Sequence, residues 1–332
     1  MTKIDWQELW QYIEPHQNIV LTSHIRPDCD ALGSELGLAI LLESKGKTVR
    51  IVNGHATPPN LAFIDPENRI LHFAADVQAA ELSDAEVLII LDTSAFAQLK
   101  PMEGWIKSFA GKTIVIDHHL GEDDFSARLF KDITSEATGR LIAECAEAWG
   151  FGFTTEFAQP IFAALATDTG WFRFGSVSET TYQLAAKLVA AGAVPADIYA
   201  SLYEQETLGR VKLRGRVLSR IQLELDGRLA HTHILKGDYA ETGALPTDTE
   251  DLINECLEIA GVEFAIILIE QPEGGFKVSF RSRCDLACNE IAAHFNGGGH
   301  RAAAGAFVKQ EFAIAKPLVL DFVIQQMQQA AI

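Results

Sequence analysis

The sequence predicts a bilobed α/β protein, in which an N-terminal, doubly wound and mostly parallel sheet precedes a smaller mixed α/β domain. With 332 residues, the chain is long enough for two domains of ordinary size. Short β-branched, leucine-rich runs alternate with helical patterns in the first half, as is typical of a parallel sheet covered by helices. The strands that we expect there are 18–23, 48–52, 86–91 and 112–116.

The first half begins with apolar residues at helical spacing over 4–14. Strand 18–23 leads to a helix over 32–44, with Gly46 as its C-cap, and then to strand 48–52. This order predicts a parallel pair of strands joined by a right-handed crossover.

The rest of the first domain is predicted to contain mostly helices and loops besides its strands. We expect loop and short helix over 55–80, a helix over 135–149, and another over 179–191 that ends at Gly192. The alanine-rich run 160–167 could be a strand or a buried helix, because periodicity does not separate the two at this length.

The composition changes after residue 192. Polar helices with several arginines are expected to form a connector, whose basic face is explained by exposure to solvent. Two hairpins follow, 221–225 with 228–235 through a two-residue turn, and 263–270 with 276–283. A helix over 286–295 comes after them. The expected domains are therefore 1–192 and 222–332, joined by a helical linker over 193–221.

The charge balance limits the partners of the chain. It has 27 basic and 45 acidic residues, a formal net charge of −18, which argues against binding of long nucleic acid in a broad basic groove. No apolar run is long enough to span a membrane, and no signal peptide is evident. Five cysteines without a Cys-x-x-Cys pair favour reduced thiols, so a cytoplasmic location is expected. The oligomeric state stays open, with a homodimer as one alternative.

Polar residues follow the apolar runs at the predicted carboxyl edge of the sheet. The clearest case is Asp117-His118-His119, directly after strand 112–116. Ligands bind at this edge of open α/β sheets. The residues that we expect to converge there as metal ligands are His24, Asp28, Asp30, Asp92, His118 and Asp168.

Four carboxylates and two imidazoles would suit two divalent cations, because four converging negative charges repel one another unless cations neutralise them. The oxygen-rich set without thiolate favours Mn²⁺, with Mg²⁺ or another first-row ion as alternatives. We expect Asp92 to bridge the ions, Asp117 to orient a histidine, and His119 to face the phosphate. Taken alone, Asp92 would be interpreted as a helix N-cap, so the prediction depends on the whole set.

The second domain contains a candidate phosphate site. Gly297, Gly298 and Gly299 would let backbone amides approach an anion, and His300 could contact it. Arg281 and Arg283 lie two apart on a predicted strand and suit bidentate phosphate recognition. A flexible turn and a solvent-exposed edge strand explain the same residues equally well.

These motifs resemble the DHH phosphoesterase superfamily. The matching residues are His24-x-x-x-Asp28-x-Asp30-Ala-Leu-Gly-Ser34, Asp92, Asp117-His118-His119 and Asp168-Thr-Gly170, while Gly297-Gly-Gly-His300 with Ser279-Phe-Arg-Ser-Arg283 resembles the DHHA1 domain. Length and order are similar to the branch of short oligoribonucleases (nanoRNases) and 3′-phosphoadenosine 5′-phosphate phosphatases. Cys29 stands where many relatives carry glycine, and Arg301 where lysine is common.

The resemblance implies a two-metal phosphohydrolase with the six ligands above, with His119 at the substrate and His300 at its terminal phosphate. We expect attack of a metal-bound hydroxide in the cleft between domains, on very short oligonucleotides or phosphorylated nucleotides. The alternatives are a phosphodiesterase of linear signalling dinucleotides, an inorganic pyrophosphatase, and a non-catalytic nucleotide sensor. A long-chain exonuclease fits the short, acidic chain less well. A dehydrogenase is disfavoured, because the first strand is not followed by a Gly-x-Gly-x-x-Gly motif.

Overall fold

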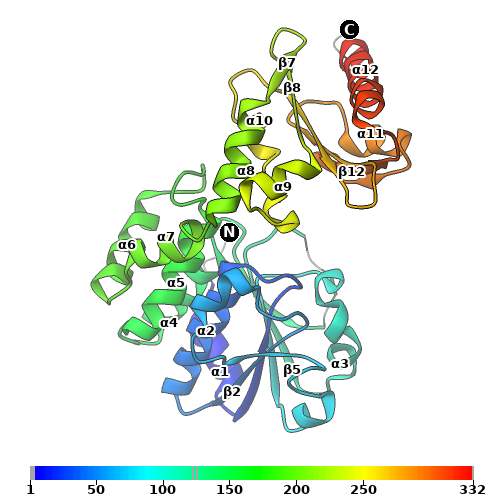
Figure 1. Cartoon of the computed structure of the whole chain (residues 1–332). Helices are drawn as coiled ribbons and strands as arrows, with labels where there is room; N and C mark the ends of the chain where they lie inside the picture. The colour runs from blue at the N-terminus through cyan, green and yellow to red at the C-terminus, as the bar shows by residue number, and fades with distance from the viewer. Residues whose placement is uncertain (1–3, 122, 125, 331–332) are drawn as a thin grey trace. The chain divides into compact units, whose positions relative to one another are not determined.

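The computed structural model describes residues 4–121, 123–124 and 126–330. The chain divides into two compact units, Met1–Gln205 and Glu206–Ile332, which are shown together in Figure 1. Each unit has its own sheet and hydrophobic core. They are described separately below.

The first unit is built on a six-stranded parallel sheet in the order β3-β2-β1-β4-β5-β6. The strands are β1 (Asn18–Thr22), β2 (Thr48–Asn53), β3 (Ile70–His72), β4 (Val87–Leu91), β5 (Lys112–Asp117) and β6 (Arg128–Lys131). The chain runs outward from β1 to β3 and then returns to β4, so the strand order reverses between β1 and β4. A crevice forms at the carboxyl ends of the strands at such a reversal, and ligands bind there.

Both faces of this sheet are buried, which explains why its strands are almost continuously apolar. One face packs against helices α1 (Trp6–Ile13), α2 (Cys29–Ser44), α4 (Thr138–Ala148) and α5 (Thr155–Asp168). The other face packs against 3₁₀ segments η2 (Ala79–Leu82) and η3 (Phe96–Met102) and helix α3 (Glu103–Ser108). The remaining elements are η1 (Pro59–Ile64), α6 (Glu179–Ala190) and α7 (Pro195–Tyr203).

Helices α2 and α5 pack unusually close together. A Cβ at Gly33 would lie 2.3 Å from the Pro160 carbonyl oxygen, and one at Gly37 would lie 2.6 Å from a methyl carbon of Ile161. Only glycine permits this approach, since such contacts are shorter than any van der Waals distance. The close packing fixes the amino end of α2 and the carboxyl end of α5, which both carry predicted metal ligands.

The doubly wound sheet of the first half is confirmed. Two helices, α2 and α5, differ from the prediction or resolve it. Helix α2 begins at Cys29 rather than Leu32, because the Asp28 carboxylate caps it by accepting hydrogen bonds from the N–H groups of Asp30 and Ala31. The ambiguous run 160–167 is helical and forms most of α5. Asp168 is therefore the last residue of a helix and does not follow a strand.

The second unit has a mixed six-stranded sheet in the order β11-β12-β10-β9-β8-β7, in which only β8 and β9 are parallel. The strands are β7 (Gln222–Glu224), β8 (Leu229–Ile234), β9 (Phe264–Glu270), β10 (Phe276–Ser282), β11 (Gly298–Gly299) and β12 (Ala303–Val308). Its helical segments are α8 (Leu208–Ser219), α9 (Lys236–Thr242), η4 (Pro246–Thr249), α10 (Asn254–Leu257), α11 (Cys288–His294) and α12 (Phe312–Ala330).

The mixed α/β character of this unit and both predicted strand pairs are confirmed. The first connection differs from the prediction, because β7 and β8 are joined by four residues, of which Leu225, Asp226 and Gly227 have positive φ. The basic face of α8 is also less exposed to solvent than expected. Arg216 and Arg220 form ion pairs with the buried carboxylate of Asp238.

Among the described residues, no single helix has the length and hydropathy to cross a membrane. Only α6 and α7 taken together pass that test, and they meet at a bend of 102°.

Candidate metal centre

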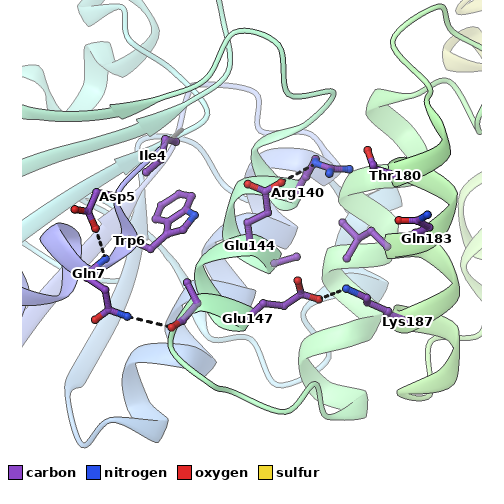
Figure 2. Close-up of a pocket in the computed structure, with 13 residues that line it drawn as sticks. Ile4, Asp5, Trp6, Gln7, Arg140, Glu144, Glu147, Thr180, Gln183 and Lys187 are labelled. Carbon is purple, nitrogen blue, oxygen red and sulfur yellow. Dashed lines mark hydrogen bonds and ion pairs between the residues drawn. The ribbon is translucent and has the colours of Figure 1, made fainter. Parts of the chain in front are cut away.

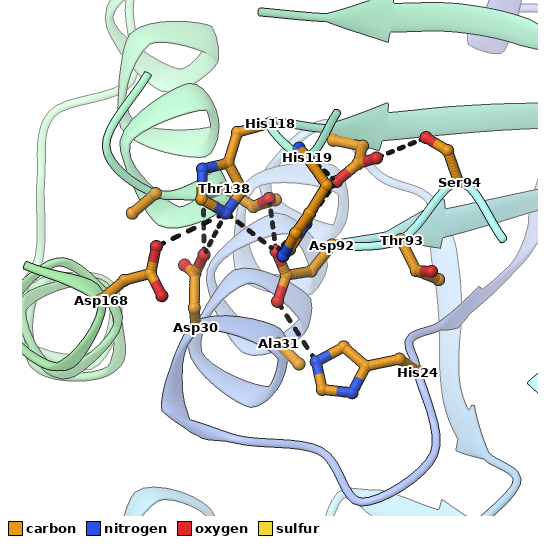
Figure 3. A network of polar contacts seen from close by, with 12 residues as sticks. His24, Asp30, Ala31, Asp92, Thr93, Ser94, His118, His119, Thr138 and Asp168 are labelled. Carbon is orange, nitrogen blue, oxygen red and sulfur yellow. Dashed lines mark hydrogen bonds and ion pairs between the residues drawn. The ribbon is translucent and has the colours of Figure 1, made fainter. Parts of the chain in front are cut away.

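The six predicted ligands come together at the carboxyl edge of the parallel sheet. Figure 3 shows five of them, His24, Asp30, Asp92, His118 and Asp168. His24 follows β1, Asp28 and Asp30 start α2, Asp92 follows β4, His118 follows β5, and Asp168 ends α5. Their ligand atoms form groups of three within 4.8 Å of one another. These groups are His24, Asp28 and Asp92; Asp30, His118 and Asp168; and Asp92, His118 and His119.

Asp92 belongs to the first and third groups and is also close to His118 of the second. One of its carboxylate oxygens is 3.3 Å from Nε2 of His24, and the other is 3.5 Å from Nε2 of His118. The side chain is buried, and its backbone has a φ of 60°, in the left-handed region. Backbone strain of this kind is retained where the surrounding structure holds a functional side chain in place. The Asp92 carboxylate is therefore held with one oxygen toward His24 and the other toward His118.

The two histidines are oriented in the manner of metal ligands. Nδ1 of His24 lies 3.0 Å from the Ile25 carbonyl oxygen, and Nδ1 of His118 lies 3.1 Å from that of Ser135. Each carbonyl can accept the Nδ1 proton, so that Nε2, which faces the carboxylates, would be the nitrogen that binds a cation in place of its own proton. Nε2 of His118 is buried and has no hydrogen-bond partner among the described residues. A divalent cation would supply the missing partner.

The electrostatics of the centre also fit cations. Burial, together with the charges of Asp92 and Asp168, raises the pKa of Asp30 well above its usual value. Burial and the neighbouring carboxylates raise the pKa of Asp168 to about 6. Although burial opposes the charged imidazolium, the hydrogen bond to Asp92 and its charge raise the pKa of His24 to about 9. Ionising Asp30 and Asp168 side by side costs free energy, because they are buried and repel other carboxylates. Bound cations would offset that cost.

The amino end of α4 holds two of the carboxylates. The Thr138 hydroxyl donates to Asp92 at 2.9 Å, and the Thr138 N–H donates to Asp30 at 2.7 Å. The N–H of Gly139 donates to the other oxygen of Asp30 at 2.8 Å. Sequence reasoning missed Thr138. Its hydroxyl and free N–H at the start of a predicted helix were the available signal.

Asp117 lies behind the centre and is fully buried. It accepts hydrogen bonds from the Ser94 hydroxyl, from the His119 N–H and from Nδ1 of His119 at 2.9 Å, and the Lys131 ammonium lies 3.3 Å away. Burial favours its neutral form, but the hydrogen bonds from His119 and Ser94 hold the pKa of Asp117 well below its usual value. Asp117 therefore orients His119, whose side chain is half exposed.

A second chain of buried polar groups supports the strand that leads to His24. The Asn53 side chain accepts the Ser23 N–H at 3.0 Å and donates to Glu35 at 2.9 Å. Neither residue was expected to belong to the site. Asn53 is the last residue of strand β2 and directly follows the predicted strand 48–52, much as the predicted ligands follow β1, β4 and β5, so its position in the sequence could have indicated it.

Two of the cavities in the first unit are similar in volume. One, of about 770 Å³, opens beside His24, Asp28, Asp92 and His119. The other, of about 730 Å³, lies among α1, α4 and α6 (Figure 2). The charges in this second cavity pair with one another, as Lys187 does with Glu147. It contains none of the predicted ligands.

The predicted phosphate-binding residues all lie in the second unit. Arg281 is in β10, and Arg283 lies one residue beyond it and donates to the Leu257 carbonyl at 2.7 Å. Gly297 is packed so tightly against β12 that a Cβ there would lie 2.2 Å from the Gly305 carbonyl oxygen. Gly298 and Gly299 form β11, and His300 is exposed after it. Close packing explains Gly297, and a role in anion binding for this group stays a prediction.

The first unit thus has a doubly wound sheet with a His/Asp cluster at its switch point, and the second unit is built on a mixed sheet. The model of the DHH family, N-terminal domain, matches residues 18–167, and that of the DHHA1 domain matches residues 230–329. The chain belongs to the DHH phosphoesterase family, as its motifs predict.

The relatives extend the match to nearly the whole chain. The chain is 30% identical over 294 residues to the bifunctional oligoribonuclease and PAP phosphatase NrnA of Thermus thermophilus, covering 88% of this chain and 84% of the relative. It is 27% identical over 304 residues to the Bacillus subtilis protein of the same name, covering 91% and 92%. The crystal structure of an exopolyphosphatase-related protein from Bacteroides fragilis superposes with a TM-score of 0.81, at 29% identity and 99% coverage of both chains.

Proposed function

We propose that this protein is a two-metal phosphohydrolase that degrades very short oligonucleotides to mononucleotides and removes the 3′-phosphate of 3′-phosphoadenosine 5′-phosphate. The observation that carries the proposal is the position of Asp92 between two groups of ligand atoms. The two NrnA relatives, which are named for these two activities and match about nine-tenths of the chain, support the choice of substrate.

We assign the first ion to His24, Asp28 and Asp92, and the second to Asp30, Asp92, His118 and Asp168. Two such ions would supply Lewis acidity and positive charge for phosphoryl hydrolysis. Mn²⁺ is the proposed ion, because carboxylates with imidazoles suit it, and Mg²⁺ or another first-row ion is the alternative.

The protein's own residues contribute orientation and charge. The half-exposed imidazole of His119 is held by Asp117, and this hydrogen bond, although partly offset by burial, raises the pKa of His119. A protonated His119 at the mouth of the centre would neutralise a phosphate oxygen as negative charge develops. Thr138 and Gly139 hold the ligand carboxylates, so that little reorganisation is needed when the ions and substrate bind.

The second unit is proposed to set substrate length. Arg281, Arg283, the glycines 297–299 and His300 would bind the phosphate at the far end of a short substrate, as the family resemblance implies. The exposed His300 is available for such a contact. A cytoplasmic location is part of the proposal, in keeping with five cysteines that form no disulfide.

The test is hydrolysis, with Mn²⁺, of a labelled dinucleotide, a pentanucleotide and a long RNA strand, alongside 3′-phosphoadenosine 5′-phosphate, a linear signalling dinucleotide and pyrophosphate. We expect the shortest oligomers and the 3′-phosphate to be cleaved fastest. Asp92→Asn should remove all activity while far-ultraviolet circular dichroism is retained. Cleavage of pyrophosphate alone, or near-normal turnover by Asp92→Asn, would contradict the proposal.

A further inference from the structure

Arg26 differs from the other arginines of the first unit. Five of them donate to a carboxylate or a backbone carbonyl in the same unit, namely Arg50, Arg69, Arg128, Arg140 and Arg173. The Arg26 side chain is exposed, and its guanidinium makes no hydrogen bond or ion pair with any described residue. A permanent cation without a partner is therefore present in the loop that carries His24 and Asp28.

Arg26 is one of the residues that line the cavity of about 770 Å³ beside the metal centre. The same cavity is lined by three carboxylates, Asp28, Asp92 and Asp123, and Arg26 pairs with none of them. Its volume lies within the range of about 300–1,000 Å³ that is usual for small-molecule sites. Arg26 can accordingly bind an anionic ligand without first breaking an ion pair.

The backbone holds Arg26 in a strained conformation. Its φ is 55°, in the left-handed region, although it directly precedes Pro27, where the allowed conformations are already restricted. Two contacts maintain this geometry. The Arg26 N–H donates to Nδ1 of His55 at 3.3 Å, and the Ile25 N–H donates to the Gln98 carbonyl at 2.7 Å. Such strain is characteristic of ligand clamps.

The cavity lies to one side of the centre. Its lining includes His24, Asp28 and Asp92, the ligands assigned to the first ion, but none of Asp30, His118 and Asp168. A group that fills it would therefore extend from one flank of a phosphate placed between the ions. The remaining wall combines apolar Ile25 and Leu120 with polar Ser94 and Gln98, which suits a nucleoside with its flat base and polar edges.

We propose that this cavity binds the nucleoside attached to the scissile phosphate and that Arg26 contacts that phosphate. This inference rests on the proposed function, because it assumes a nucleotide substrate at the metal centre. The planar guanidinium presents paired N–H donors that match two phosphate oxygens. Arg26 would thus determine specificity for phosphorylated nucleosides, with His55 as its positioning residue.

The first experiment measures binding of adenosine monophosphate, adenosine and inorganic phosphate to the Mn²⁺-loaded full chain by calorimetric titration. Arg26→Ala should weaken binding of adenosine monophosphate and phosphate by about 10- to 100-fold, as expected for loss of a charge-assisted contact, and affect adenosine far less. Arg26→Lys should recover part of the loss. Arg69→Ala, which removes a surface pair with Glu43, is the matched control and should bind as the wild type does.

A second variant tests the cavity itself. Ala95→Trp would fill it and should weaken adenosine monophosphate more than inorganic phosphate. Wild-type affinity for adenosine monophosphate in Arg26→Ala would overturn the assignment of Arg26, and equal losses in Ala95→Trp would overturn the nucleoside site. If binding depends on Arg26 but no oligonucleotide is cleaved, the proposed function fails and the binding site holds.

Discussion

Glu35→Gln should stabilise the first unit at alkaline pH. Glu35 lies within α2, is fully buried and accepts one hydrogen bond from the Asn53 side chain. Burial, only partly opposed by that hydrogen bond, raises the pKa of Glu35 from 4.5 to about 8. The folded protein therefore keeps this carboxyl neutral at physiological pH, and glutamine reproduces the neutral form without its titration.

The expected magnitude follows from proton linkage. In the unfolded chain Glu35 ionises near pH 4.5, whereas in the folded chain it holds its proton to about pH 8. The folded state thus binds more protons across this window, so stability falls as the pH rises, by about 1.4 kcal/mol per pH unit. Relative to the wild type, the variant should gain nothing below about pH 4.5 and about 5 kcal/mol above about pH 8.

Tryptophan fluorescence during urea unfolding measures this gain, because all five tryptophans lie in the first unit. The titration should be run in chelator, so that bound metal does not contribute. Glu43→Gln, an exposed position on the same helix, is the matched control and should show little pH-dependent difference. A gain for Glu35→Gln that does not change with pH, or a loss at about pH 9, would refute the reasoning.

Three further predictions concern the residues around the centre. Thr138→Val removes the hydroxyl that donates to Asp92 and should lower Mn²⁺ affinity by about 10- to 100-fold in a titration; an unchanged affinity would deny it this role. Lys131→Met removes the ammonium beside the buried Asp117 carboxylate and should lower the free energy of unfolding by about 3 kcal/mol, with a reduced kcat; a melting temperature like that of the wild type would contradict this. His300→Ala should raise KM for dinucleotides far more than for a small chromogenic phosphodiester, and equal effects would count against binding of the far phosphate.

The metal ligands were predictable because parallel strands bring their carboxyl ends to one edge. β1, β4 and β5 are adjacent, so His24, Asp92 and His118 converge whatever the intervening loops do. Asp168 was predicted as a ligand although the sequence did not show whether a helix or a strand precedes it, since both can be alanine-rich, buried and continuously apolar. Its place in the cluster depends on the close packing of α5 against α2.

The supporting residues were missed for a different reason. Thr138 and Lys131 act on partners 46 and 14 residues away in the sequence. The start of a predicted helix marks the Thr138 hydroxyl and N–H as available donors, but no local pattern indicates which carboxylates accept from them. Edge strands β3 and β6 were also missed, because they are short and less buried than the central strands. Glu35 lies within a largely apolar helix, and its burial becomes evident only after α2 is packed on the sheet.

The most direct test of the central claim is the stoichiometry of Mn²⁺ binding to the intact chain by equilibrium titration. Two ions per chain are expected for the wild type, and no more than one tightly bound ion for Asp92→Asn, because both groups of ligands share that carboxylate. A single ion in the wild type, or two ions that remain tightly bound in Asp92→Asn, would contradict a centre in which Asp92 joins two metals.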